Sequence, residues 1–177
     1  MENFTSIFGI KFGISKEDLF KSLEGRYYYY SDHQNPSPNS IIINWIEIAG
    51  RKTDKIIFNF FEDKLCSTEA IFDPQFEEKL IEEYSEMKNE ISNKYFKSEN
   101  DYFEYEPPHY PTDDYYETIK ALEKGHLKIE CWWNFSTNTD FDNYIILKIS
   151  PNEKIHLKYE YTELNRKYIE KLKTQDY

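Results

Sequence analysis

This sequence of 177 residues has little cysteine and little glycine, and both shortages exclude classes of site. The two cysteines, Cys66 and Cys131, lie far apart and form no Cys-x-x-Cys pair. This argues against a disulfide scaffold and against a cysteine-ligated zinc site. A single disulfide bond between Cys66 and Cys131 stays an alternative. The five glycines form neither G-x-x-x-x-G-K nor G-x-G-x-x-G, so nucleotide binding through those phosphate loops is excluded.

Long hydrophobic runs are also absent. No stretch approaches the roughly 20 apolar residues that a membrane-spanning helix requires. The first residues, from Met1 to Thr5, lack the basic and apolar regions of a secretory signal. We therefore expect no membrane span, and a protein that is cytoplasmic or was exported with its signal removed. The sequence does not decide between these two.

Catalytic and metal-binding motifs are missing as well. No G-x-S-x-G nucleophile elbow is present, and the four histidines lack the i, i+4 spacing of a helical zinc site. His109 lies close to Asp113 and Asp114, but this segment has neither the glycine turn nor the ligand spacing of a calcium loop. We predict no catalytic site, no bound metal and no cofactor. An enzyme assembled from distant residues, for example with Asp32 and His33, stays an alternative.

Positive charge is scarce too. Lysine and arginine number 22 against 33 aspartates and glutamates, which gives a formal net charge of −11. Phosphate groups repel such a chain, so we expect neither nucleic acid nor an anionic membrane surface as a partner. A basic protein or a cation is the easier partner. The simplest alternative is that the charge only keeps the protein soluble.

Aromatic residues, by contrast, are abundant at 18% of the chain, and each buries a large area. A chain of this length and content builds a core without a disulfide or a metal. The periodicity predicts a single α+β domain, residues 1–177, with antiparallel meander sheets covered by helices. The predicted strands are 7–12, 41–49, 55–61, 64–72, 126–135, 143–150 and 154–161.

Four helices are predicted between these strands. The first follows the N-cap Ser15, the second is 74–97 with Asp73 as its cap, and the third is 115–124. The last is 163–173, capped by Thr162. Apolar faces are predicted from Phe76, Leu80, Tyr84, Met87, Ile91 and Tyr95 in the second helix and from Leu164, Tyr168, Ile169 and Leu172 in the last.

The two halves of the chain share a pattern. Each runs from a helix into a three-strand meander, over 7–72 and 74–161, before the C-terminal helix 163–173. This similarity predicts two α-β-β-β units in tandem. A chance likeness of the two halves is the alternative.

A short motif opens the first predicted helix. It reads Phe12-Gly13-Ile14-Ser15-Lys16-Glu17-Asp18-Leu19 and resembles the start of small envelope lipoproteins of the outer-membrane assembly type. The fold of those lipoproteins is related to that of the β-lactamase inhibitor proteins. The resemblance implies a binding or inhibitory scaffold rather than an enzyme. The sequence lacks the lipobox cysteine of those lipoproteins, so the resemblance does not imply membrane anchoring. It assigns no functional residue.

The segment 98–118 is the main candidate for partner binding. It contains seven acidic residues, no lysine or arginine, six aromatic residues and three prolines. Loops of this length are commonly functional, and this one predicts recognition of a basic partner; a stiff cover over a sheet edge is the alternative. The predicted contact residues are Tyr105, His109, Tyr110, Asp113, Asp114, Tyr115 and Tyr116 in this segment, together with Tyr28 and Tyr30 from an earlier tyrosine run.

Two further aromatic features allow more than one interpretation. The run from Tyr27 to Tyr30 is either half core and half surface, or presents its outward pair to a partner. Trp132 and Trp133 are expected on opposite faces of a strand, one in the core and the other a hot-spot candidate if exposed.

The leading hypothesis for function is a non-enzymatic binding protein. It would recognise a basic protein partner, in the manner of an acidic inhibitor or immunity protein, because opposite charge speeds association. The alternatives are a small-ligand binder with an aromatic-lined pocket, an unrecognised enzyme and a self-associating subunit. The sequence identifies neither the partner nor the oligomeric state.

Overall fold

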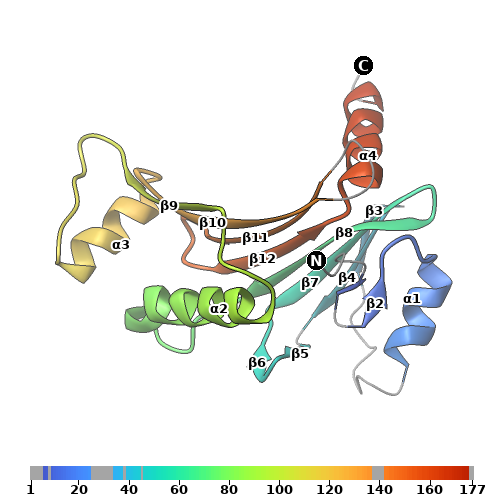
Figure 1. The fold of residues 1–177 in the computed structure, drawn as a ribbon, viewed down its shortest axis with the longest axis horizontal. Helices are drawn as coiled ribbons and strands as arrows, with labels where there is room; N and C mark the ends of the chain where they lie inside the picture. The colour runs from blue at the N-terminus through green and yellow to red at the C-terminus, as the bar shows by residue number, and fades with distance from the viewer. Residues whose placement is uncertain are drawn as a thin grey trace. The chain divides into compact units, whose positions relative to one another are not determined.

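The protein has an α+β fold built on a mostly antiparallel sheet, as the computed structural model shows (Figure 1). The structure describes residues 6–7, 9–24, 34–37, 39–44, 46–136 and 142–175, and among these no helix is long and apolar enough to cross a membrane. Its helices are α1 (Lys16–Leu23), α2 (Leu80–Lys94), α3 (Tyr115–Glu123) and α4 (Thr162–Gln175), with a short 3-10 turn, η1 (Glu77–Lys79).

The strands form one eight-stranded sheet and two small two-stranded sheets in the described residues. The order of the large sheet is β3-β4-β7-β8-β12-β11-β10-β9, so the second series of strands runs in reverse along the sheet. The strands are β1 (Ser6–Ile7), β2 (Ile10–Lys11), β3 (Gln34–Ser37), β4 (Ser40–Asn44), β5 (Glu47–Ile48), β6 (Arg51–Lys52), β7 (Lys55–Phe61), β8 (Lys64–Phe72), β9 (Asn100–Tyr105), β10 (Leu127–Phe135), β11 (Asn143–Ile149) and β12 (Ile155–Glu160).

The chain divides into two compact units, each made of separate segments. Unit 1 comprises Met1–Ala70, Phe135–Tyr144 and Lys158–Tyr177, and unit 2 comprises Ile71–Asn134 and Ile145–Leu157. The predicted single domain and the predicted tandem repeat of 7–72 and 74–161 both stay predictions.

Local signals determine much of unit 1. Ser15 caps α1, because its Oγ accepts a hydrogen bond from the Asp18 amide at 3.1 Å. The turn between β7 and β8 has positive φ at Glu62 (49°) and Asp63 (59°), as a tight hairpin turn requires.

The predicted strand 7–12 is wrong as a single strand. Gly9, with φ of 75°, turns the chain so that β1 and β2 form a small hairpin.

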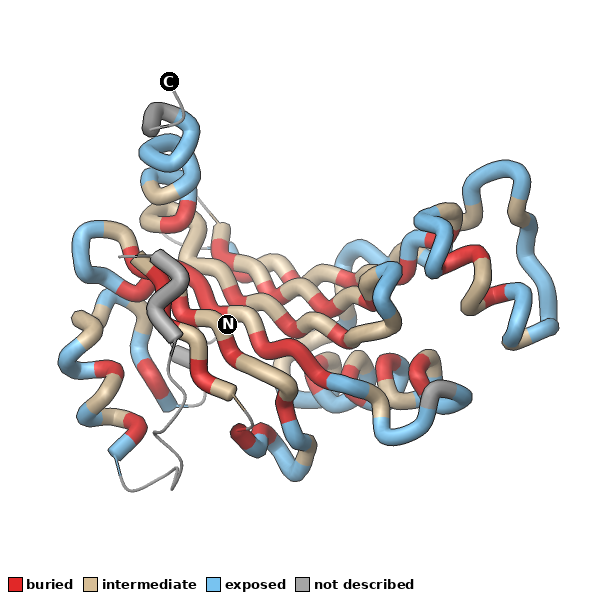
Figure 2. The backbone as a smooth tube through the Cα atoms, turned by 180° about the vertical axis from the view of Figure 1, so that it is seen from behind, coloured by how far each residue is buried: buried red, intermediate tan, exposed pale blue. Residues whose placement is uncertain are grey.

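In unit 2, α2 lies against one face of β10 and its neighbours (Figure 1). The residues of β10, β11 and β12 alternate between buried and half-buried, as Figure 2 shows by colour. Trp133 is fully buried, whereas Trp132 lies on the opposite face and is half-buried, which confirms their predicted alternation. The buried side chains of α2 are Leu80, Tyr84, Met87 and Ile91.

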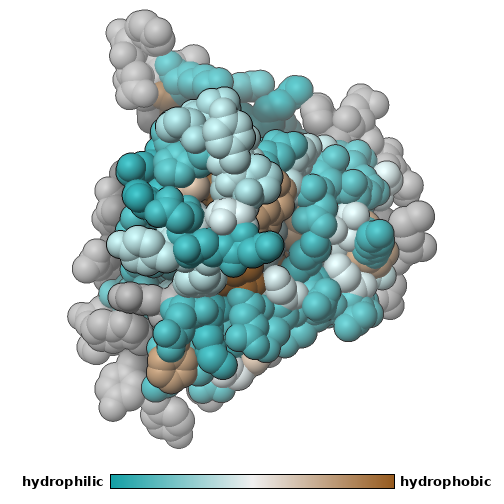
Figure 3. Space-filling model, turned by 90° about the vertical axis from the view of Figure 1, so that its left-hand side faces the viewer, coloured by the Kyte–Doolittle hydropathy of each residue, from teal (hydrophilic) through white to brown (hydrophobic). Residues whose placement is uncertain are grey.

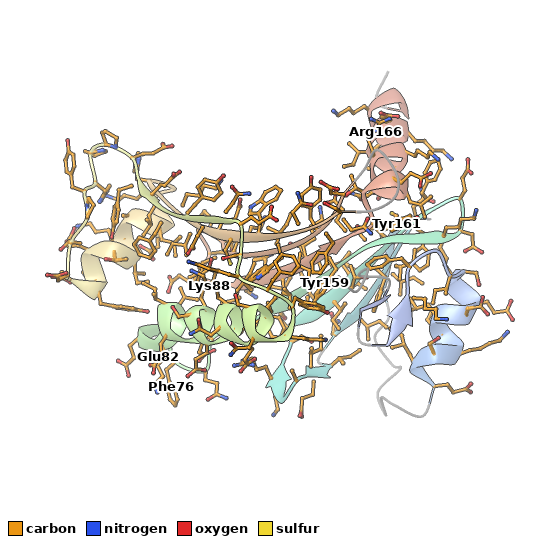
Figure 4. The ribbon with its side chains drawn as sticks, in the orientation of Figure 1. Phe76, Glu82, Lys88, Tyr159, Tyr161 and Arg166 are labelled. Carbon is orange, nitrogen blue, oxygen red and sulfur yellow. The ribbon has the colours of Figure 1, made fainter. Side chains whose placement is uncertain are left out.

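The predicted start of the second helix is wrong. The α-helix begins at Leu80 rather than near Pro74, and Asp73 does not cap it. The Asp73 carboxylate pairs instead with Lys154 at 3.0 Å. Phe76 lies outside the helix with 58% of its surface exposed, so it is not part of the apolar face (Figure 4).

The C-terminal helix α4 also differs in detail from its prediction. The Thr162 hydroxyl is buried without a hydrogen-bond partner, so it caps nothing in the described structure. The first-turn amide of Thr162 donates instead to Asn143 Oδ1 at 3.2 Å. On the predicted apolar side, Ile169 and Leu172 each remain 40% exposed.

Candidate partner-binding site

The segment 98–118, predicted as a loop, begins with a strand. Asn100–Tyr105 form β9, which pairs antiparallel with β10 over six consecutive residue pairs. Sequence reasoning missed this strand because exposed residues dominate it and no clean alternation marks it. Lys88 of α2, which Figure 4 labels, forms an ion pair with Asp101 of this strand. One of the seven acids of the segment is thus neutralised within unit 2.

The true loop is shorter, residues 106–114, and connects β9 to α3 (Figure 1). Its first residue is bonded to the residue just before β10, because the Glu106 amide donates to the His126 carbonyl at 2.7 Å. The His109 amide donates to the Glu106 carbonyl at 3.1 Å, and the His109 ring stacks on His126 with centroids 5.3 Å apart. His109 therefore anchors the loop.

The end of the loop is held by the N-cap of α3. Asp114 Oδ1 accepts hydrogen bonds from the amides of Tyr116 and Glu117, at 2.8 and 3.3 Å. The hydroxyls of Tyr105 and Thr118 lie 3.1 Å apart, which ties β9 to α3 directly. Asp114 and Tyr105, both predicted as contact residues, therefore have positions that support the loop.

Three predicted contact residues face outward. Tyr110 and Tyr116 are 71% and 74% exposed, and Asp113 is exposed without an ion pair among the described residues. Tyr115 is half-buried. We call Tyr110, Asp113 and Tyr116 the tip. The side of the molecule that carries the loop is mainly hydrophilic, with small hydrophobic patches (Figure 3).

Three further aromatic residues bear on the predicted contact set. Tyr28 and Tyr30 lie outside the described residues. Phe103, in β9, is 52% exposed and its ring lies 5.9 Å from that of Tyr105, yet it was absent from the predicted contacts. Only its position between Tyr102 and Tyr105 could have pointed to it, since exposure depends on its place in the sheet.

The opposite face of β10 carries a polar and aromatic group. Lys128 Nζ lies 4.2 Å from the Tyr102 ring centroid, and Trp132 Nε1 donates to Glu130. Lys128 and Glu130 also form an ion pair at 3.3 Å. Trp132 is therefore held by its neighbours and is a weaker hot-spot candidate than the tip tyrosines.

The two cysteines are free and buried. Burial raises the pKa of the Cys66 thiol to about 12 and that of the Cys131 thiol to about 11. Both thiols therefore stay protonated at neutral pH, where a nucleophilic thiolate is needed for catalysis. Within the described ranges, no group of three or more His, Cys, Asp or Glu side chains is placed to hold a metal ion.

Comparisons with known proteins add no family. No family model, no curated protein and no solved structure matches the chain. The resemblance to envelope lipoproteins and β-lactamase inhibitor proteins accordingly stays a prediction.

Proposed function

We propose that this protein is a non-enzymatic binding protein that recognises a basic protein partner through the tip, in the manner of an inhibitor or immunity protein. The observation that carries the proposal is the exposure of Tyr110, 71%, on a loop whose two ends are anchored, and of Tyr116, 74%, in the first turn of α3 directly after that loop.

The tip tyrosines supply the contact area. A tyrosine offers a large amphipathic surface and loses few rotamers on binding, which is why tyrosines are frequent in binding surfaces and hot spots. Most of the surface of both tip tyrosines lies in solvent, so it is accessible to a partner.

The carboxylates of the segment 98–118 supply negative charge that attracts a basic partner. Glu117 is paired with Lys120 at 3.2 Å and Asp101 with Lys88, but Glu104, Glu106 and Asp113 form no ion pair with described residues. Unpaired surface charge steers an oppositely charged partner and raises its association rate. A basic protein therefore fits this surface better than a neutral one.

Anchoring lowers the cost of binding. The stacked His109 and His126 rings hold the loop at one end, and the Asp114 cap holds it at the other. A loop already held in place loses less conformational entropy when a partner binds. The tip is therefore a pre-organised contact surface.

The test is quantitative capture from an extract of the cells that encode the protein. Tagged protein is compared with a Tyr110→Ala/Tyr116→Ala variant and with a Phe76→Ala control, an exposed aromatic outside the tip. We expect a basic protein that is retained at about 50 mM salt, weakened at about 500 mM salt and reduced about tenfold or more by the tip variant alone. Equal capture by all three proteins would contradict the proposal. Loss of a captured enzyme's activity on adding the purified protein would support the inhibitor class.

A further inference from the structure

We infer that the free edge of β9 receives an extended, basic segment of the partner as an added strand. The inference rests on the proposed function for the charge of the partner, but it assigns a separate surface and a mode of binding. Strand addition obtains affinity from main-chain hydrogen bonds and specificity from alternate side chains.

β9 is the last strand of the eight-stranded order, with β10 as its only neighbour in the described sheet. The Glu106 amide bonds to His126 across the ladder, and the register continues without a shift through Tyr105–Leu127 to Asn100–Trp132. Hydrogen-bonded and non-hydrogen-bonded pairs alternate in an antiparallel ladder. Glu104 and Tyr102 therefore direct their backbone groups toward β10.

The backbone groups of the intervening residues point the other way. Asp101, Phe103 and Tyr105 alternate with the β10-bonded residues, so their N–H and C=O groups lie along the open edge. No described backbone group outside the ladder bonds to their amides. The edge thus offers a regular row of donors and acceptors to an incoming strand.

Natural sheets usually protect such a row. Short edge strands, prolines, bulges and charged side chains, lysine above all, are the common devices. β9 has six pairs in unbroken register and contains no proline and no lysine. The prolines begin only at Pro107, after the strand has ended. Its charged residues are Asp101 and Glu104, which repel acidic strands only, so the edge is left open to a basic partner strand.

The side chains along the edge define that partner. Phe103 is 52% exposed at the rim and would pack against an apolar residue of the added strand. Glu104, Glu99 and Glu106 are exposed and form no ion pair with described residues. A second copy of β9 would bring like charges together, which is unfavourable. An extended segment that alternates lysine or arginine with apolar residues fits both features.

The probe for the test is a labelled peptide of about ten residues that alternates lysine and valine. Its matched controls are the same peptide with N-methyl groups on alternate residues, which removes donors and keeps the charge, and a peptide with glutamate in place of lysine. Fluorescence anisotropy should show binding of the first peptide. N-methyl groups on the side of the peptide that faces β9 should weaken peptide binding about tenfold or more, because the β9 carbonyls then lose their donors. Equal binding of the methylated peptides would overturn strand addition in favour of charge attraction alone.

The protein variants make the same distinction. Phe103→Pro removes an outward amide without removing a ladder bond, whereas Phe103→Ala keeps that amide. We expect Phe103→Pro to lose about tenfold more affinity for the peptide than Phe103→Ala, with far-UV circular dichroism unchanged. Hydrogen exchange by NMR gives a direct readout. The peptide should slow exchange at Phe103 and Tyr105 and leave Tyr102 and Glu104 unchanged.

The two proposals fail in different ways. If capture from extract is lost in the tip variant but the peptide protects no β9 amide, the edge inference is wrong and the proposed function stands. If capture survives the Tyr110→Ala/Tyr116→Ala changes but is lost with Phe103→Pro, the tip is wrong and the edge is supported.

Discussion

The two edges of the eight-stranded sheet are built differently. β3, Gln34–Ser37, is four residues long, contains Pro36 and pairs with β4 through a register shift between Gln34 and Ser37. β9 is six residues long, contains no proline and pairs with β10 in unbroken register. A proline removes a donor and a register shift breaks the row, so the β3 edge is a poor template for another strand.

The difference lies first in the backbone row that each edge offers, and the side-chain charges then decide which strands can approach it. The segment around β9 is rich in acids, which disfavour pairing with a second copy, but its backbone row is intact. β3 is a poor template whatever the charge of the approaching strand, whereas β9 disfavours acidic strands and suits basic ones. Selectivity of this kind is what a binding edge needs.

The largest effect should come from removing the support of β9. Trp133, fully buried in β10, fills the core beneath the strand to which β9 is paired. We expect Trp133→Ala to lower the free energy of unfolding by about 3–5 kcal/mol, measured by urea denaturation. Trp132→Ala, on the half-buried face, is the matched control and should cost about 1 kcal/mol. Equal losses in both variants would show that the assigned faces are wrong.

A smaller effect should separate the two sides of β9. Glu104→Pro removes an amide that faces β10 and leaves a Lys128 carbonyl without its donor, which should cost about 1–3 kcal/mol. Phe103→Pro removes an outward amide and should cost about 1 kcal/mol or less. Urea denaturation of both variants measures the difference. The reverse order would mean that the ladder alternates in the opposite phase, and the outward row would then be Tyr102 and Glu104.

The smallest effect concerns the protected edge. Pro36→Thr restores an amide to β3 but leaves the register shift relative to β4. We expect the free energy of unfolding to change by no more than about 0.5 kcal/mol, and the lysine–valine peptide to gain no second binding site in a titration. A second site in that titration would show that the proline alone protects this edge.

The sequence predicted the α+β class and most strand positions because their signals are local. The strands 55–61 and 64–72 coincide with β7 and β8, and the helix 115–124 coincides closely with α3, ended by Gly125 at φ of 72°. The candidate site was predicted less completely. Tyr110, Asp113 and Tyr116 lie exposed as a contact surface requires, whereas Tyr105, His109 and Asp114 hold the loop in place.

By itself, the sequence determined those features whose partners lie within a few residues. Ser15 finds the Asp18 amide one turn away, and Glu62 and Asp63 close a hairpin between adjacent strands. Tertiary structure alone decided the state of β9 and the role of Asp73, because their partners come from β10 and from Lys154. All side chains of β9 are exposed or half-buried, so its sequence carries no buried face and no alternation that would reveal the strand.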